Sequence, residues 1–163
     1  MKAQEWGVAN VYVYRSGIID WLKKYPDQVL FNGQEFAGDP AEYLLDSEKY
    51  LARCLSPQEF VAQSGEPSTV VFDIRDVAGR QKFPIKLVGI KHYPVDRVVK
   101  LVRSGSRKIS RKRLLILDGC GTQAKWLQYV LEEAGVENYF FLEGGVLNWR
   151  RVGLDHTGQM QGQ

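Results

Sequence analysis

The stretch from Leu114 to Trp149 decides the fold, and it reads LLILDGCGTQAKWLQYVLEEAGVENYFFLEGGVLNW. Two short runs in it, 114–117 and 139–142, are apolar without interruption, which is typical of strands covered on both faces. The segment between them has an apolar face at helical spacing and a polar face opposite, and Gly135 then ends it as a left-handed C-terminal cap. The apolar positions are Trp126, Leu127, Val130, Leu131 and Ala134, and the polar positions are Gln128, Glu132 and Glu133. Because short loops join strand, helix and strand, we expect a βαβ unit with parallel strands.

The rest of the chain predicts further elements of the same two kinds. Residues 70–74 form another continuous apolar run and predict a buried strand. Ser56-Pro57-Gln58-Glu59 is a capping box with proline at the first helical position, which predicts a helix to about Gln63. Asp39-Pro40-Ala41-Glu42 predicts a helix running toward Arg53, and an apolar stripe predicts another after Pro94. Helices that alternate with buried strands indicate an α/β layered domain.

Length and composition limit the classes of protein that fit. A chain of 163 residues, 44% hydrophobic and 25% charged, is long enough for one domain with a full core and is not disordered overall. The net charge of +3 does not by itself indicate a polyanion partner, and no apolar stretch reaches the ~20 residues of a membrane helix. Two histidines and two separated cysteines do not make a metal site, so we expect no metal and no cofactor. So few cysteines also favour a reduced, cytoplasmic setting.

The residues after the strand at 114–117 are the candidate site. Asp118 follows that strand directly and precedes the helix, whose first N–H groups are unpaired and lie at the positive end of its dipole. With Gly119 and Gly121 letting the backbone curl, the loop is a candidate anion cradle. Cys120 is a candidate nucleophile there, because such a position lowers a thiol pKa, or else a small inert turn residue. The candidate anion-binding residues are Gly119, Gly121, Thr122, Gln123, Ala124 and Lys125.

Two other features allow two interpretations each. The segment 103–113 is the most basic in the chain and is either a patch for an acidic partner or nucleic acid, or a solvated loop. It leads into the start of the strand at 114–117, so we expect it at the opposite end of the sheet from Asp118. Cys54 lies beside Leu55 in the helix expected to run toward Arg53, where it is interpreted as a core residue.

Residues 8–21 align without gaps to residues 136–149, with valine, asparagine, glycine and tryptophan at equivalent places. Both copies predict a strand, a glycine turn and a short helix anchored by tryptophan. The match is either a coincidence between two generic units or the remnant of a duplicated domain. In the second case residues 1–35 lack a domain of their own, and must pack on the surviving one or on another molecule.

Several of these motifs, taken in order, resemble the rhodanese-like (sulfurtransferase) family over about residues 56 to 150. The ending 142–149, LEGGVLNW, resembles the family's leucine-glutamate-glycine-glycine, hydrophobic, tryptophan pattern. Asp73-Ile74-Arg75 resembles its aspartate-x-arginine signature, and residues 89–96 resemble the segment where a strand leads into a proline-started helix. The resemblance implies a three-layer α/β domain with a central, mainly parallel sheet flanked by helices. Rhodaneses often occur in tandem, which would explain the repeat as the end of a preceding domain.

The resemblance also implies a chemistry. Rhodaneses carry a cysteine at the end of the central strand, which takes sulfane sulfur from a donor such as thiosulfate, while the N–H groups of the next loop stabilise the sulfur anion. In this chain the matching slot holds Asp118, as in the non-catalytic domains of tandem rhodaneses. A carboxylate cannot form a persulfide and repels an anionic donor, although it can cap the helix.

Two functions therefore remain open. The first is a catalytically impaired module that binds or regulates a protein partner; the second is an active sulfurtransferase, with thiosulfate or another sulfane-sulfur donor, that forms a persulfide on Cys120. A related dual-specificity phosphatase would need arginine six residues after the cysteine, where Trp126 stands. Nucleic acid and membrane are not expected partners, and residues 1–35 could join copies of the chain in a homo-oligomer. We expect a remnant at 1–35, the rhodanese-like domain at 36–155 and a flexible tail at 156–163.

Overall fold

The computed structural model describes residues 24–25, 30–31, 34–35, 47–105, 109 and 112–161. The chain divides into two units, Met1–Leu44 and Leu45–Gln163. In the first unit, β1 (Leu30–Phe31) pairs antiparallel with β2 (Gln34–Glu35). The repeat copy at 8–21 and the helix start predicted at Asp39 lie outside the described residues.

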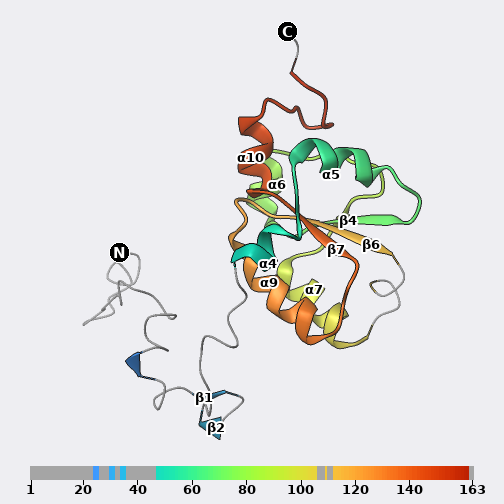
Figure 1. Ribbon diagram of the computed structural model, residues 1–163. Helices are drawn as coiled ribbons and strands as arrows, with labels where there is room; N and C mark the ends of the chain where they lie inside the picture. The colour runs from blue at the N-terminus through green and yellow to red at the C-terminus, as the bar shows by residue number, and fades with distance from the viewer. Residues whose placement is uncertain are drawn as a thin grey trace. The chain divides into compact units, whose positions relative to one another are not determined.

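The second unit is an α/β domain built on a five-stranded sheet in the order β3-β7-β6-β4-β5 (Figure 1). Every strand pair in it is parallel, which confirms the expected βαβ arrangement. The strands are β3 (Cys54–Leu55), β4 (Thr69–Asp73), β5 (Lys91–His92), β6 (Arg113–Leu117) and β7 (Tyr139–Leu142). The helices are α4 (Ser47–Leu51), α5 (Pro57–Ser64), α6 (Val77–Lys82), α7 (Val95–Arg103), α9 (Thr122–Glu133) and α10 (Gly145–Arg151).

Local signals set the limits of the helices. Ser56 and Glu59 form the predicted capping box of α5, with Ser56 Oγ accepting the Glu59 N–H at 3.3 Å. At the end of α9, Gly135 adopts a φ of 66°. The N–H of Val136 then donates to the Leu131 carbonyl at 2.9 Å, and that of Gly135 to Glu132 at 3.0 Å. This pair of bonds is a Schellman motif, as the glycine predicted.

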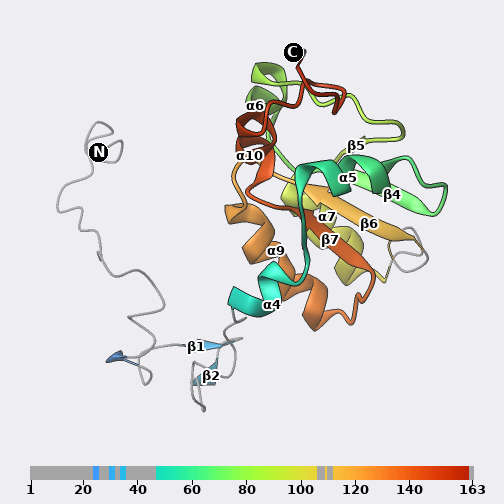
Figure 2. The same ribbon diagram turned by 45° about the horizontal axis from the view of Figure 1, so that its top comes forward.

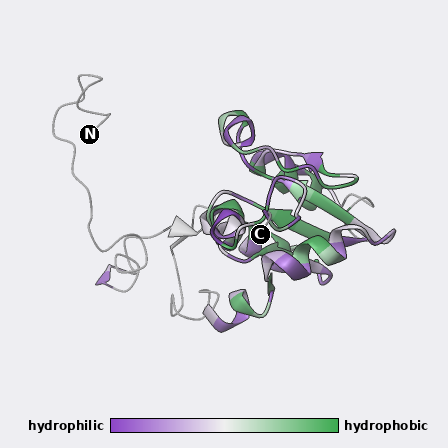
Figure 3. Cartoon of the chain, turned by 90° about the horizontal axis from the view of Figure 1, so that it is seen from above, coloured by the Kyte–Doolittle hydropathy of each residue, from purple (hydrophilic) through white to green (hydrophobic). Residues whose placement is uncertain are grey.

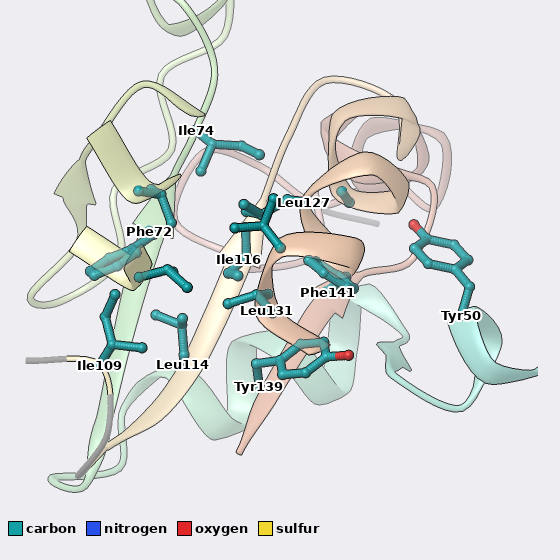
Figure 4. Packing of buried hydrophobic residues seen from close by; sticks show 14 residues of the cluster. Tyr50, Phe72, Ile74, Ile109, Leu114, Ile116, Leu127, Leu131, Tyr139 and Phe141 are labelled. Atoms are coloured by element: carbon teal, nitrogen blue, oxygen red, sulfur yellow. The ribbon is translucent and has the colours of Figure 1, made fainter. Parts of the chain in front are cut away.

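The strands of the sheet alternate their side chains between two cores. One core, drawn in Figure 4, lies on the α7 and α9 side and contains Phe72, Leu114, Ile116 and Phe141. The other lies under α5 and α10 and includes the next residues along the strands, such as Val71, Leu115 and Leu142. The strands are accordingly drawn mostly green, for hydrophobic, in Figure 3. Burial on both faces is the reason why these strands are continuous apolar runs.

Three sequence expectations for the side chains and backbone were wrong. Trp126, expected on the buried face of α9, is 53% exposed, and Ala134 is also exposed. Gln128, expected on the polar face, is 1% exposed, and its Nε2 donates to the Lys49 carbonyl of α4 at 3.4 Å. Cys54 lies in the edge strand β3, since the helix predicted to reach Arg53 ends at Leu51.

The two ends of β6 agree with the sequence prediction, whereas the C-terminal residues differ from it. Arg113 lies at the amino end of β6 and pairs with Glu66 at 3.4 Å, whereas Asp118 follows the carboxyl end of the same strand. Residues 156–161, expected as part of a flexible tail, belong to a hydrogen-bonded turn: the Asp155 N–H donates to Gln159 at 2.7 Å and the Lys86 N–H to His156 at 2.7 Å. In the part of the chain that is described, no helix is long and apolar enough to cross a membrane.

Candidate functional site

The candidate loop follows β6, the middle strand of the sheet, and leads directly into α9 (Figure 2). Residues 118–121 make the connection, and Gly121 takes a φ of 88°, a left-handed conformation that a side chain would disfavour. The loop therefore lies at the carboxyl edge of a parallel sheet, where α/β folds commonly bind ligands.

The Asp118 carboxylate occupies the centre of this loop. Asp118 is 1% exposed, and its Oδ1 accepts the Gly121 N–H at 2.7 Å. Oδ2 accepts the N–H groups of Gln123 and Ala124 at 2.9 and 3.2 Å. The prediction that Asp118 caps the following helix is confirmed. The cradle of N–H groups is thus already filled by a carboxylate of the chain itself.

Gly145, the second glycine of the 142–149 motif, packs closely against the loop. Gly145 has a φ of 62°, and a β-carbon on it would lie 2.6 Å from both Asp118 Oδ1 and the Cys120 backbone nitrogen. The first turn of α10 donates into the loop, from Val146 to the Asp118 carbonyl at 2.9 Å and from Leu147 to Gly119 at 3.0 Å. Only glycine permits this approach, which gives the motif a physical reason.

The other predicted site residues are spread between solvent and core. The Cys120 thiol is exposed and its Sγ lies 3.3 Å from Thr122 Oγ1. Gln123 is also exposed, whereas the Ala124 side chain is buried in the core. Lys125 is exposed, with its ammonium 5.2 Å from the centre of the Tyr50 ring. The structure thus brings the backbone of the loop together and leaves the thiol outside it.

Sequence reasoning missed Tyr50 and the position of Cys54. Tyr50 is buried, stacks on Phe141 with ring centres 5.7 Å apart, and donates from its hydroxyl to the Gly121 carbonyl at 3.4 Å. Burial is the main cause that raises the pKa of Tyr50, so it stays a neutral donor. Cys54 Sγ donates to the Tyr50 carbonyl at 3.4 Å, and burial likewise raises the pKa of that thiol. Nothing in the local sequence indicates either contact.

The aspartate-x-arginine signature forms a structural pair at the neighbouring strand end. Asp73 is fully buried, and its oxygens accept from Arg75 Nε at 2.9 Å and Nη2 at 2.7 Å. Arg75 Nη1 also donates to the carbonyls of Gly79 and Phe83, at 3.2 and 2.9 Å. The guanidinium is therefore committed to joining β4 to α6 and is not available to an anionic ligand. Within the described ranges, no group of three or more candidate ligands could hold a metal.

Comparisons with known proteins place this fold. No family model matches the sequence, and no curated protein matches it. A protein of unknown function and possible tyrosine phosphatase from Rhodopseudomonas palustris CGA009 is 18% identical, with a TM-score of 0.53 over 67% of this chain and 92% of that one. A full-length protein from Lactobacillus plantarum is 24% identical, with a TM-score of 0.51 over 66% and 89%. The rhodanese-like domain of an Anabaena sp. protein is 23% identical, with a TM-score of 0.49 over 62% and 75%.

The resemblance found in the sequence is confirmed at the level of the fold. The domain has the rhodanese-like α/β fold, with a wholly parallel five-stranded sheet and helices on both faces. At these sequence identities, the similarity to the solved structures shows only a shared fold. A function has to be inferred from the residues of the candidate site.

Proposed function

We propose that this chain is a rhodanese-like module that binds or regulates a partner protein and does not turn over sulfur. The observation that carries the proposal is the engagement of the Gly121, Gln123 and Ala124 N–H groups by the Asp118 carboxylate. A bound sulfur anion needs N–H donors of this kind, and in this chain the Asp118 carboxylate already accepts hydrogen bonds from them. A carboxylate offers no sulfur on which a persulfide can form.

Electrostatics support the same conclusion. Asp118 is 1% exposed, so its charge is little screened, and an approaching thiosulfate dianion would meet like charge. The neighbouring guanidinium of Arg75 is occupied by Asp73 and two carbonyls, so it offers no compensating positive charge.

The second candidate is sulfur transfer by Cys120, and its exposed thiol favours it. In that reaction the thiolate attacks the outer sulfur of thiosulfate, the S–S bond breaks and sulfite leaves. Cyanide then takes the sulfur as thiocyanate and restores the thiolate. The thiol would have to do this without the three N–H groups that Asp118 occupies.

A thiosulfate:cyanide assay combined with mass spectrometry of the protein decides between the two. We expect no turnover and no persulfide on the native chain. Asp118→Cys in a Cys120→Ser background should acquire a persulfide at position 118 because the vacated N–H groups then face a thiolate. Cys54→Ser is the matched control and should change nothing. Turnover of the native chain that Cys120→Ser abolishes and Cys54→Ser spares would overturn the proposal.

We also propose a reducing compartment for the protein, self-association through residues 1–35, and an origin of those residues in a tandem arrangement. Both cysteines of the chain are free thiols, which supports a reducing compartment such as the cytoplasm. Self-association through residues 1–35, and their origin in a tandem arrangement, concern residues that mostly lie outside the described part. Size measurement in solution of the full chain and of a chain starting at Leu45 would test the first of these, and a monomer in both cases would contradict it.

A further inference from the structure

An open hollow lies between α7 and α9, which run side by side in Figures 1 and 2. Its volume is about 610 Å³, and its lining comprises Asp96, Val99, Lys100, Arg103, Ser104 and Trp126. The hollow is distinct from the Asp118 loop, none of whose residues 118–121 lines it.

Trp126 is the unusual member of this lining. It is 53% exposed although it belongs to the helix that supplies Leu127 and Leu131 to the core. A single exposed apolar residue needs no explanation, but a tryptophan beside a hollow offers a large, rigid contact area of the kind that dominates binding energy at protein interfaces.

The charges around the hollow favour a negatively charged occupant. Lys100 and Arg103 occupy the last turn of α7, and both are exposed. Within residues 47–105, 109 and 112–161, neither has a salt-bridge partner. The sequence just beyond α7 adds Arg107, Lys108, Arg111 and Lys112, so positive charge continues in the chain from this end of the helix.

We infer that the hollow between α7 and α9 docks an acidic segment of a partner protein, with an apolar side chain seated on Trp126 and carboxylates facing Lys100 and Arg103. A nucleic acid fits less well, because the single tryptophan of this lining does not make the row of stacking surfaces that single strands use. The inference rests on the proposed function, because it names the surface through which the module would bind its partner protein, and it is independent of whether the loop transfers sulfur.

Fluorescence anisotropy with the full chain tests this surface. The probe is a fluorescein-labelled peptide in which Glu-Glu-Leu-Phe-Glu-Glu occurs twice, and the comparison ligands are the same peptide with lysine for glutamate and a labelled single-stranded RNA of equal length. We expect the acidic peptide to bind, and to bind more tightly than either comparison ligand. Higher salt should weaken binding because it screens the exposed cations.

Variants of exposed residues localise the binding. Trp126→Ala should weaken the acidic peptide by about tenfold or more, as should Lys100→Glu combined with Arg103→Glu. The matched controls carry the same kinds of change on exposed residues outside the hollow: Leu147→Ala, and Lys82→Glu combined with Lys91→Glu. Near-native affinity is expected in both controls.

Three results would overturn the inference. The first is the absence of binding at about 1 mM peptide. The second is an equal loss of affinity in the hollow variants and in the controls, and the third is tighter binding of the RNA than of the acidic peptide. The sulfurtransferase assay of the native chain measures a different event, so a failure to bind the peptide would reject this surface and leave the test of sulfur turnover unchanged.

Discussion

Gly145 lies so close to Asp118 that a β-carbon on the glycine would come within 2.6 Å of the carboxylate oxygen Oδ1. This approach joins the N-terminus of α10 to the loop that precedes α9, two segments that meet at the carboxyl edge of the sheet. Gly145 at the start of α10 and Asp118 after β6 are therefore parts of one structure.

Gly145→Ala should lower the free energy of unfolding by about 2–4 kcal/mol, from left-handed backbone strain together with overpacking. The neighbour Gly119 offers a matched control, since it has nothing within 4 Å of an added β-carbon. Urea denaturation of both variants checks this. Equal stability of the Gly145→Ala and Gly119→Ala proteins would show that the close approach is absent in solution.

Asp118→Ala should destabilise the domain by about 2–3 kcal/mol because it leaves buried N–H groups without an acceptor. Asp76→Ala is the comparison: Asp76 is the exposed N-cap of α6 and accepts a single N–H, from Gly79 at 2.6 Å. That change should cost about 1 kcal/mol. Thermal and urea unfolding measure both, and a smaller loss at Asp118 than at Asp76 would contradict the capping role.

Arg75→Met should cost about 3–5 kcal/mol, since it removes the guanidinium that pairs with the fully buried Asp73 carboxylate and leaves only the half-exposed His92 imidazole, at 3.7 Å, as an ion-pair partner. Replacing both residues, with Asp73→Leu and Arg75→Met, should recover much of the loss, because no charge then remains buried. As a control, Arg113→Met breaks a more exposed pair with Glu66 and should cost no more than about 1 kcal/mol. A double variant as unstable as Arg75→Met alone would argue against this account.

The two thiols should differ in reactivity toward a disulfide reagent. Cys120 is exposed, whereas Cys54 is partly buried and its thiol pKa is raised above the usual 9.0, chiefly by burial. Only thiolate reacts, and each unit of pKa lowers its fraction about tenfold. We expect a fast phase that Cys120→Ser removes and a slow phase that Cys54→Ser removes. The slow phase should accelerate as pH rises, since the raised pKa of Cys54 makes its thiolate abundant only at high pH. A single rate shared by both thiols would contradict the expected difference in reactivity.

Much of this domain could be predicted from short-range patterns. The apolar runs located β4, β6 and β7, and Ser56 with Glu59 opened α5 as their spacing predicted. Gly135 ended α9, and Asp118 capped it, because each of these interactions joins residues a few positions apart. Such contacts are determined by backbone geometry and hydrogen bonding within one turn, so the sequence alone contains them.

What the tertiary structure decided depends on neighbours that are distant in sequence. Gln128 is buried because α4 covers it, and Trp126 is exposed beside a hollow at α7, although helical periodicity gave the two residues the opposite environments. Cys54 became a strand residue by pairing with Phe141. By itself, the sequence predicted that Asp118 follows a buried strand and can cap the next helix. Only the packing of Gly145 against the loop decided that the carboxylate is enclosed while Cys120 faces solvent, because burial is set by which segments meet in space.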